Sequence, residues 1–132
     1  MPGSFLDSNV ILCLASGEQT KADRAEELMA HGGTISIQVL NEVANVARRK
    51  MGMSWADTRN FLTTIRELLQ VEPMTIATHD AGIDLAEQYG LSIYDGMIVA
   101  AALLAECETL LSEDLQDGLL IRRRLRIVNP FR

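Results

Sequence analysis

Patterns typical of β-strands and α-helices alternate along this sequence, and the alternation restricts the possible folds more than any other feature. Short apolar or β-branched runs predict strands at residues 5–6, 34–37, 71–76, 109–112 and 126–128. Segments with helical spacing of apolar residues lie between them, at residues 9–14, 22–30, 38–51, 54–70, 78–89 and 95–106. Strands joined by helices through short connections indicate an α/β fold with a mainly parallel sheet. Pro73 places the third strand at a sheet edge or shortens it.

The composition is that of one globular domain covering residues 1–132. Hydrophobic residues make up 48% and charged residues 23% of the chain, which excludes disorder as its main state. The longest uncharged apolar run, residues 96–105, is about half the roughly 20 residues that a membrane span needs. The first seven residues lack the basic region of a signal peptide, so we expect a cytoplasmic protein with no membrane contact. Cys13 and Cys107 are far apart and are expected to be buried thiols.

The charge of the chain is unevenly distributed. The net charge of −6 disfavours non-specific binding of nucleic acids. Residues 1–118 carry 7 basic and 18 acidic residues, whereas residues 119–132 carry five arginines and no acid. The basic strip at residues 122–126 is either a solvated surface or a docking site for a polyanion or an acidic partner.

Four carboxylates occupy positions that do not favour folding. Asp7 and Asp114 come directly after predicted strands, and the carboxyl ends of parallel strands open onto one crevice. Asp95 opens the most apolar helix of the chain, and Glu42 lies on an apolar helix beside Val43. Each has an ordinary explanation when taken alone: a helix cap for Asp7, a dipole partner for Asp95, an exposed helix acid for Glu42 and a turn former for Asp114.

If these acids converge, a cation has to compensate their repulsion. Oxygen ligands favour Mg²⁺ or Mn²⁺ over Zn²⁺. Asn9 is expected either to cap a helix or to orient Asp7, and Ser112 either to end a strand or to orient Asp114.

The sequence gives little support for other catalytic chemistries. His31 and His79 are expected at the surface, and neither a Gly-x-Ser-x-Gly elbow nor a glycine-rich phosphate loop is present. No lysine follows Lys50, which counts against phosphoryl transfer through an aspartate. The chemistry that remains is attack of a metal-activated water on a phosphodiester.

Five segments carry a family resemblance. They are residues 5–12 (FLDSNVIL), 38–42 (QVLNE), 93–102 (IYDGMIVAAA), 110–114 (LLSED) and 126–131 (RIVNPF). In this order they resemble the PIN-domain ribonucleases, most closely the toxin subunit of VapBC-type toxin–antitoxin pairs, over essentially the whole chain.

The resemblance implies a three-layer, Rossmann-like fold, commonly dimeric, and an acidic cluster that binds Mg²⁺ or Mn²⁺. The implied cluster consists of Asp7, Glu42, Asp95 and Asp114. Asp7 and Asp95 are implied as direct ligands, Asp114 as a direct or water-mediated ligand, and Glu42 as a residue that orients water or holds a second ion. Asn9 matches the position that supports Asp7, and Ser112 matches the hydroxyl position near Asp114.

One position departs from the family pattern. Relatives often carry a further acid two residues after the fourth one, where this sequence has Gln116. Asp117, one position later, is the candidate substitute, and the number of bound ions stays open.

The sequence therefore predicts a metal-dependent endoribonuclease that is a toxin held inactive by an antitoxin. RNA is expected to lie along Arg48, Arg49 and Lys50 or along the strip at residues 122–126. A catalytically inactive RNA-binding or scaffold domain of the same fold is one alternative. A metal-dependent phosphatase or phosphoacceptor of another Rossmann-like family is the second.

Overall fold

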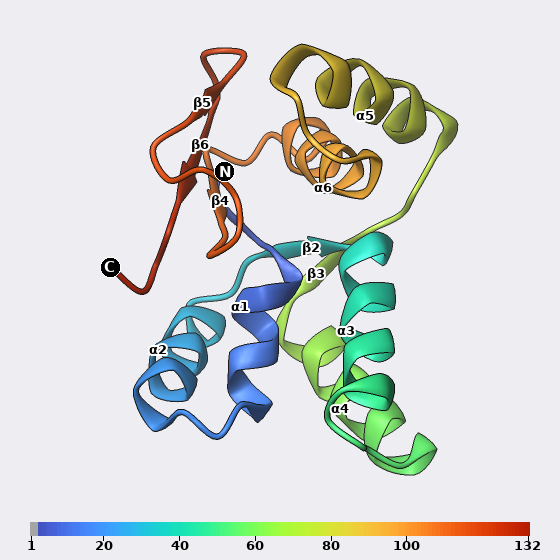
Figure 1. Cartoon of the computed structure of the whole chain (residues 1–132), viewed down its shortest axis with the longest axis vertical. Helices are drawn as coiled ribbons and strands as arrows, with labels where there is room; N and C mark the ends of the chain where they lie inside the picture. Colours follow the sequence, from blue (N-terminus) through green and yellow to red (C-terminus); the bar gives the residue numbers. More distant parts are fainter. Residues whose placement is uncertain (1–2) are drawn as a thin grey trace.

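The computed structural model describes residues 3–132, and in it strands and helices alternate as the sequence predicts (Figure 1). The strands are β1 (Ser4–Leu6), β2 (Thr34–Ser36), β3 (Gln70–Glu72), β4 (Thr109–Leu111), β5 (Leu120–Ile121) and β6 (Leu125–Val128). The helices are α1 (Ser8–Leu12), the 3-10 turn η1 (Cys13–Ala15), α2 (Gln19–Ala30), α3 (Ile37–Arg49), α4 (Trp55–Leu68), α5 (Ile76–Tyr89) and α6 (Ile93–Leu104). None of these helices has the length and apolarity to span a bilayer.

The strands form one sheet in the order β3-β2-β1-β4-β6-β5. Every neighbouring pair is parallel except β5 with β6, so the mainly parallel α/β sheet that the sequence predicts is confirmed. β3 lies at one edge and ends before Pro73, as the proline predicts. β5 was not expected, because a strand of two residues is too short to show the alternation of apolar and polar side chains. It pairs with β6 through a tight turn in which Arg122 and Arg123 have positive φ angles.

Several expected element ends differ from the structure by a few residues, and side-chain caps explain two of these differences. Ile37 begins α3 instead of ending β2, since the Ser36 hydroxyl accepts a hydrogen bond from the Val39 amide at 3.3 Å. The Thr75 side chain caps α5, so that helix begins at Ile76, a residue that was expected in a strand.

Helices cover both faces of the sheet, and Figure 1 shows α5 and α6 together on one side and α1 to α4 on the other. The core between these layers includes the fully buried side chains of Phe5, Ile35, Leu110 and Ile127 from the strands. Residues 96–103 of α6 are all buried, as the lack of a polar face on this helix predicts.

The strand order places a topological switch point between β1 and β4. The chain moves from β1 outward to β2 and β3, then crosses back over the sheet through α5 and α6 to β4. Loops that leave the carboxyl ends of the two central strands diverge at such a point and leave a crevice there. Asp7 follows β1, and Ser112 and Asp114 follow β4, so both loops carry polar side chains into this crevice.

Gly96 is expected to be the glycine where a side chain is least tolerated. A Cβ atom there would collide with the carbonyl oxygen of Gly82 and lie 3.1 Å from the Cβ of Ala86, both on α5. Gly96→Ala is expected to lower the free energy of unfolding by about 1–3 kcal/mol, because the two helices would have to separate. Urea unfolding measures the change. Gly17→Ala is the control, since that position has open space, and equal losses for both variants would contradict the prediction.

Candidate active site

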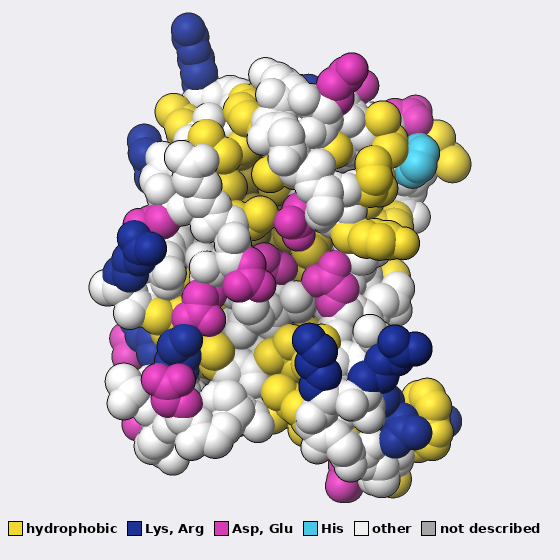
Figure 2. All heavy atoms as spheres, in the orientation of Figure 1, with side chains coloured by type: hydrophobic (Ala, Val, Ile, Leu, Met, Phe, Trp, Pro, Cys, Tyr) yellow, Lys and Arg dark blue, Asp and Glu magenta, His cyan; other side chains and the backbone are white. Residues whose placement is uncertain are grey.

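The candidate site lies at the carboxyl ends of β1 and β4, beside the first turns of α1 and α6 and the N-terminal half of α3. Figure 2 shows acidic side chains gathered across the middle of one face. Each of the four predicted acids comes from a different part of the chain, namely the loops after β1 and β4 and the helices α3 and α6.

Asp7 is the central residue of this site and is buried, with 3% of its surface exposed. It is held between β4 and α1, because its amide donates to the Leu111 carbonyl at 2.9 Å and its Oδ1 caps α1 by accepting from the Ser8 amide at 2.7 Å. Its Oδ2 accepts from the Ser112 hydroxyl at 2.8 Å and from Asn9 Nδ2 at 3.0 Å. The carboxylate therefore accepts these three hydrogen bonds from neighbouring groups, and the backbone amide of Asp7 makes a fourth.

Ser112 and Asn9 join Asp7 to the loop after β4. The Ser112 hydroxyl is fully buried, donates to Asp7, and accepts from the amides of Asp114 and Leu115 at 3.2 Å each. Asn9 Nδ2 lies 3.2 Å from Asp114 Oδ2, and Asn9 Oδ1 accepts from the Glu113 amide at 2.9 Å. The loop that carries Asp114 is thus held against α1 by side chains from both sides.

Glu42 is connected to the same network through Ser8. The Ser8 hydroxyl donates to Glu42 Oε1 at 2.8 Å and lies 3.4 Å from Asp7 Oδ1. Glu42 Oε2 accepts from Gln38 Nε2 at 3.1 Å, one turn earlier on α3. One serine therefore links two carboxylates from separate helices.

Asp95 is half-buried in the first turn of α6, where the Ser92 side chain caps the helix by accepting from the Asp95 amide at 3.1 Å. Burial raises the pKa of Asp95, and the charges of Glu42 and Asp114 add to the rise while a hydrogen bond with Ser92 opposes it. Asp95 thus faces the other acids across space, without a direct hydrogen bond to them among residues 3–132.

Burial and neighbouring negative charges disfavour the ionised form of Asp7. Burial raises the pKa of Asp7 from 3.8 to about 6; hydrogen bonds from Ser112 and Ser8 oppose this rise, and the charges of Glu42 and Asp95 increase it. A carboxylate that is buried beside like charges favours either a proton or a nearby cation. The arrangement therefore attracts a cation more strongly than any single exposed acid would.

The donor set fits a hard divalent cation. The side chains that face one another offer carboxylate and hydroxyl oxygens, and within residues 3–132 no histidine or cysteine side chain is hydrogen-bonded to them. Within residues 3–132, no three His, Cys, Asp or Glu side chains lie close enough to enclose an ion by themselves. Mg²⁺ keeps several of its waters and binds proteins through only one or two carboxylates, so it does not need three acids in direct contact.

A family model for the PIN domain matches residues 4–120. The chain belongs to the PIN domain family. Its match covers β1 through β4, reaches the first residue of β5 and includes all four acids. Among curated proteins, none matches the chain.

Solved structures with the same fold are distant in sequence. A toxin–antitoxin complex from Klebsiella pneumoniae is 20% identical with a TM-score of 0.74, over 97% of this chain and 98% of that one. VapC20 of Mycobacterium tuberculosis, described as a toxin that cleaves the sarcin–ricin loop, is 17% identical with a TM-score of 0.69, over 85% and 90%. VapBC2 of Rickettsia felis, bound to a fragment of its promoter DNA, is 19% identical with a TM-score of 0.66, over 96% and 98%. These likenesses show a shared fold.

Asp117, the candidate substitute at the departing position, lies against the C-terminal segment of the PIN domain. Its Oδ1 accepts from the Asn129 amide at 2.7 Å, and its Oδ2 lies 3.6 Å from Arg132. Within residues 3–132 it makes no hydrogen bond to the four acids. Gln116 is exposed in the same loop.

Three residues of this PIN domain site were not singled out from the sequence as functional. Ser8 bridges Asp7 and Glu42, and Gln38 holds Glu42. Glu113 pairs with Lys21 of α2 beside the site. The contact between Gln38 and Glu42 could have been predicted, because the two residues are four positions apart on one helix. Lys21 and Glu113 are brought together only by the fold.

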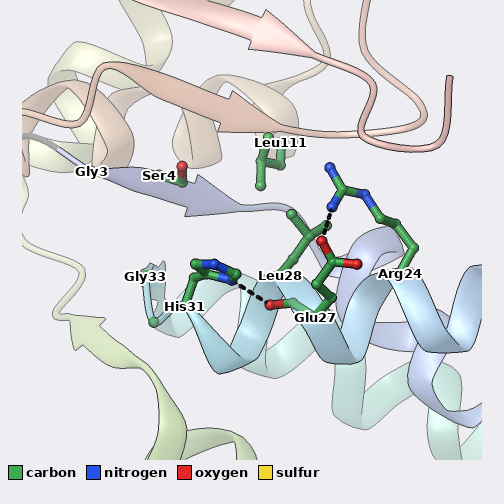
Figure 3. A pocket seen from close by; sticks show the side chains of 9 residues that line it. Gly3, Ser4, Arg24, Glu27, Leu28, His31, Gly33 and Leu111 are labelled. Atoms are coloured by element: carbon green, nitrogen blue, oxygen red, sulfur yellow. Dashed lines mark hydrogen bonds and ion pairs between the residues drawn. The ribbon is translucent and has the colours of Figure 1, made fainter.

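A hollow of 480 Å³ between α2 and the start of β1 is a weaker candidate site (Figure 3). Its polar side chains are already paired: Arg24 with Glu27 at 2.9 Å and with the Pro130 carbonyl at 3.1 Å, and His31 Nδ1 with the Glu27 carbonyl at 2.8 Å. Since those groups already have partners, this hollow offers little free charge for a ligand.

Proposed function

We propose that this PIN domain is a metal-dependent endoribonuclease. The observation that carries the proposal is the buried Asp7 carboxylate, which Ser112, Asn9 and Ser8 tie to the acids of two other segments. A folded protein retains such a cluster of like charges against its stability, which is typical of a catalytic site. The alternatives named from the sequence, a non-catalytic scaffold and a phosphatase, are outcomes of the tests below.

Asp7 and Asp95 are the proposed direct ligands of Mg²⁺ or Mn²⁺, with Asp114 and Glu42 acting directly or through water. A bound divalent ion supplies an activated water and neutralises charge on the scissile phosphate. Asn9 and Ser112 orient the Asp7 carboxylate by donating to its Oδ2, and the hydrogen bond from Ser112 partly opposes the rise in its pKa. Glu42 is the proposed residue that orients a water molecule by accepting a hydrogen bond from it, and the bonds from Ser8 and Gln38 support this role by fixing the carboxylate.

Cleavage of RNA tests this function directly. Purified protein is incubated with a pool of structured RNAs in Mg²⁺, in Mn²⁺ and in EDTA, beside Asp7→Asn protein prepared in the same way. Discrete products that need the metal and vanish in the variant are expected. Metal binding and RNA binding without any cleavage would instead favour a scaffold, and release of phosphate from a small monoester would favour a phosphatase.

Ser112→Ala is expected to weaken Mn²⁺ binding by about 10- to 100-fold, because groups that orient metal ligands contribute on that scale. The variant removes the donor to Asp7 and the acceptor for two amides of the Asp114 loop. Isothermal titration with Mn²⁺ measures the affinity. Ser54→Ala, which removes a helix cap remote from the acids, is the control and should bind Mn²⁺ as the wild type does.

We propose further that the enzyme is the toxin of a toxin–antitoxin pair. The similar structures from Klebsiella and Rickettsia are described as toxin–antitoxin proteins. A groove of 520 Å³ between α3 and α4 supports the proposal, since Ile37, Leu40 and Leu62 give it an apolar lining for a partner segment. An arginine of that partner would bind the acids and replace the cation. A partner peptide that inhibits cleavage, and loses inhibition when its arginine becomes glutamine, is the expected result.

A homodimer that acts on RNA in the cytoplasm completes the proposal. Exposed apolar side chains at the starts of α5 and α6, Ile76, Ile93 and Tyr94, offer a surface for a second copy. Light scattering after size exclusion measures the mass, and a mass of one chain at micromolar concentration would contradict the dimer.

A further inference from the structure

We propose that the pocket between the facing ends of α3 and α4 is a subsite for one unpaired RNA base, which stacks on Trp55. This inference rests on the proposed ribonuclease function and names where the substrate strand runs. Ala44, Asn45, Arg48, Arg49 and Trp55 line the pocket, whose volume is 340 Å³. That volume is at the lower end of the range for small-ligand sites and suits a single planar group.

Trp55 is held with one face of its indole covered. It is the first residue of α4, and 60% of its surface is exposed. The guanidinium of Arg48 lies over the ring at 4.2 Å from its centre, and Arg48 Nη1 also donates to the Met53 carbonyl. Arg48 covers one side of the ring while most of the residue stays exposed, so we expect the other face to accept a base, and bases of every type stack on such rings.

The surroundings of Trp55 carry a charge that complements RNA. Residues 45–66 contain five basic residues and one acid, Asp57, in a chain whose net charge is −6. The ion pairs within residues 3–132 involve only Lys21, Arg24 and Arg132 as cations. The charges of the five basic residues at positions 45–66 are therefore not neutralised by an acid of the described chain. Figure 2 shows Lys and Arg side chains over the lower ends of α3 and α4, below the acidic region.

Helix α3 connects this pocket to the acids. Glu42, Asn45 and Arg49 have the spacing i, i+3, i+7 and therefore lie on one face of the helix. The helical rise places Arg49 roughly 10 Å along the axis from Glu42. A strand whose phosphate lies at the acids thus reaches Arg49 with the next phosphates and Trp55 with a base. An acidic side chain would use the same charges, but a carboxylate has no ring that could stack on the indole.

Trp55 is the single tryptophan of the chain, so its own fluorescence reports on the subsite. The wild-type protein is titrated in EDTA, where the RNA is not cut, with a ten-nucleotide single-stranded RNA and with an abasic strand of equal length. Strong quenching by the RNA is expected, and little quenching by the abasic strand. Equal quenching by both strands, or none with an RNA that binds by gel shift, would overturn the proposal.

Substitutions separate stacking from charge. Trp55→Ala is expected to weaken binding of the ten-nucleotide RNA by roughly 10- to 100-fold, and Trp55→Phe by much less, because phenylalanine still stacks. Leu68→Ala, another exposed apolar residue on α4, is the matched control and should bind normally. Arg49→Gln should reduce affinity and its salt dependence, whereas Arg59→Gln, outside the pocket, should have less effect.

The outcomes distinguish this subsite from the proposed function. RNA cleavage and binding that are unaffected by Trp55→Ala would overturn the subsite and leave the ribonuclease standing. A wild type that binds no RNA would remove both. If Trp55→Ala lowers the mass of an oligomer while RNA affinity is unchanged, the surface is a contact between copies of the chain, and the subsite is wrong.

Discussion

In metal-free buffer at pH 8, Asp7→Asn protein is expected to be more stable than the wild type by about 2 kcal/mol. The pKa of Asp7 is raised to about 6 in the folded protein, and its ordinary value of 3.8 applies to the unfolded chain. A difference of this size corresponds to about 3 kcal/mol against the ionised folded state. An asparagine removes that penalty but turns an amide NH₂ toward Asn9 or Ser112, which costs about 1 kcal/mol.

The sign of the pH dependence follows from the direction of the shift. Between pH 3.8 and about 6 the folded protein retains a proton on Asp7 that the unfolded chain has lost. The stability of the wild type therefore falls as the pH rises through this window, and the full penalty is present above it. At pH 4, where most of this penalty is absent, the asparagine variant should be slightly less stable than the wild type, by up to about 1 kcal/mol, and its advantage should reach its maximum by about pH 7.

Urea unfolding in EDTA at pH 4.5, 6 and 8 measures both effects. Asp84→Asn, at an exposed position on α5, is the matched control. The difference in unfolding free energy between this variant and the wild type should be the same at all three pH values. Addition of Mg²⁺ should stabilise the wild type much more than the asparagine variant, because the variant lacks one of the two carboxylates proposed as direct ligands. A variant that is less stable than the wild type at pH 8 in EDTA would show that Asp7 serves the fold and not a cation.

The second large effect is expected on RNA cleavage. Asp7→Asn and Asp95→Asn should each lower kcat/KM by about 100- to 1000-fold, which is the scale for removing one group that stabilises charge in a transition state. Glu42→Gln and Asp114→Asn should cost about 10- to 100-fold, as expected for residues that act through water or through a neighbour. These substitutions keep the shape of the side chain and remove its charge.

Asp117→Asn is the control for this series, since Asp117 is hydrogen-bonded to Asn129 and not to the other acids. Its rate of cleavage should stay within a few-fold of the wild type, as measured on the RNA that the wild type cuts best. A loss as large as that of Asp95→Asn would show that Asp117 takes the place of the family acid missing at Gln116. Equal activity of Asp7→Asn and wild type would remove the active site described above.

Much of the fold could be predicted from local sequence patterns, and the wrongly predicted element ends have local causes. The helix over residues 95–106 and the strand at residues 109–112 could be predicted because long apolar segments are decided by burial alone. Ile37 and Ile76 were placed in strands because β-branched residues favour extended backbone, and the caps at Ser36 and Thr75 outweigh that preference. The strand at residues 120–121 exists only through its pairing with β6, so its own residues gave no signal.

The sequence by itself determined which side chains stand out, because an acid after a strand or at the head of an apolar helix violates the pattern of its own segment. It therefore indicated Asp7, Glu42, Asp95 and Asp114, together with the all-oxygen chemistry that they share. Only the tertiary structure decided how these acids are joined. The bridges through Ser8, Ser112 and Asn9 depend on contacts between segments up to 105 residues apart, and so does the burial that raises the pKa of Asp7. Local spacing carries no information on such contacts, since the order of strands in the sheet fixes them.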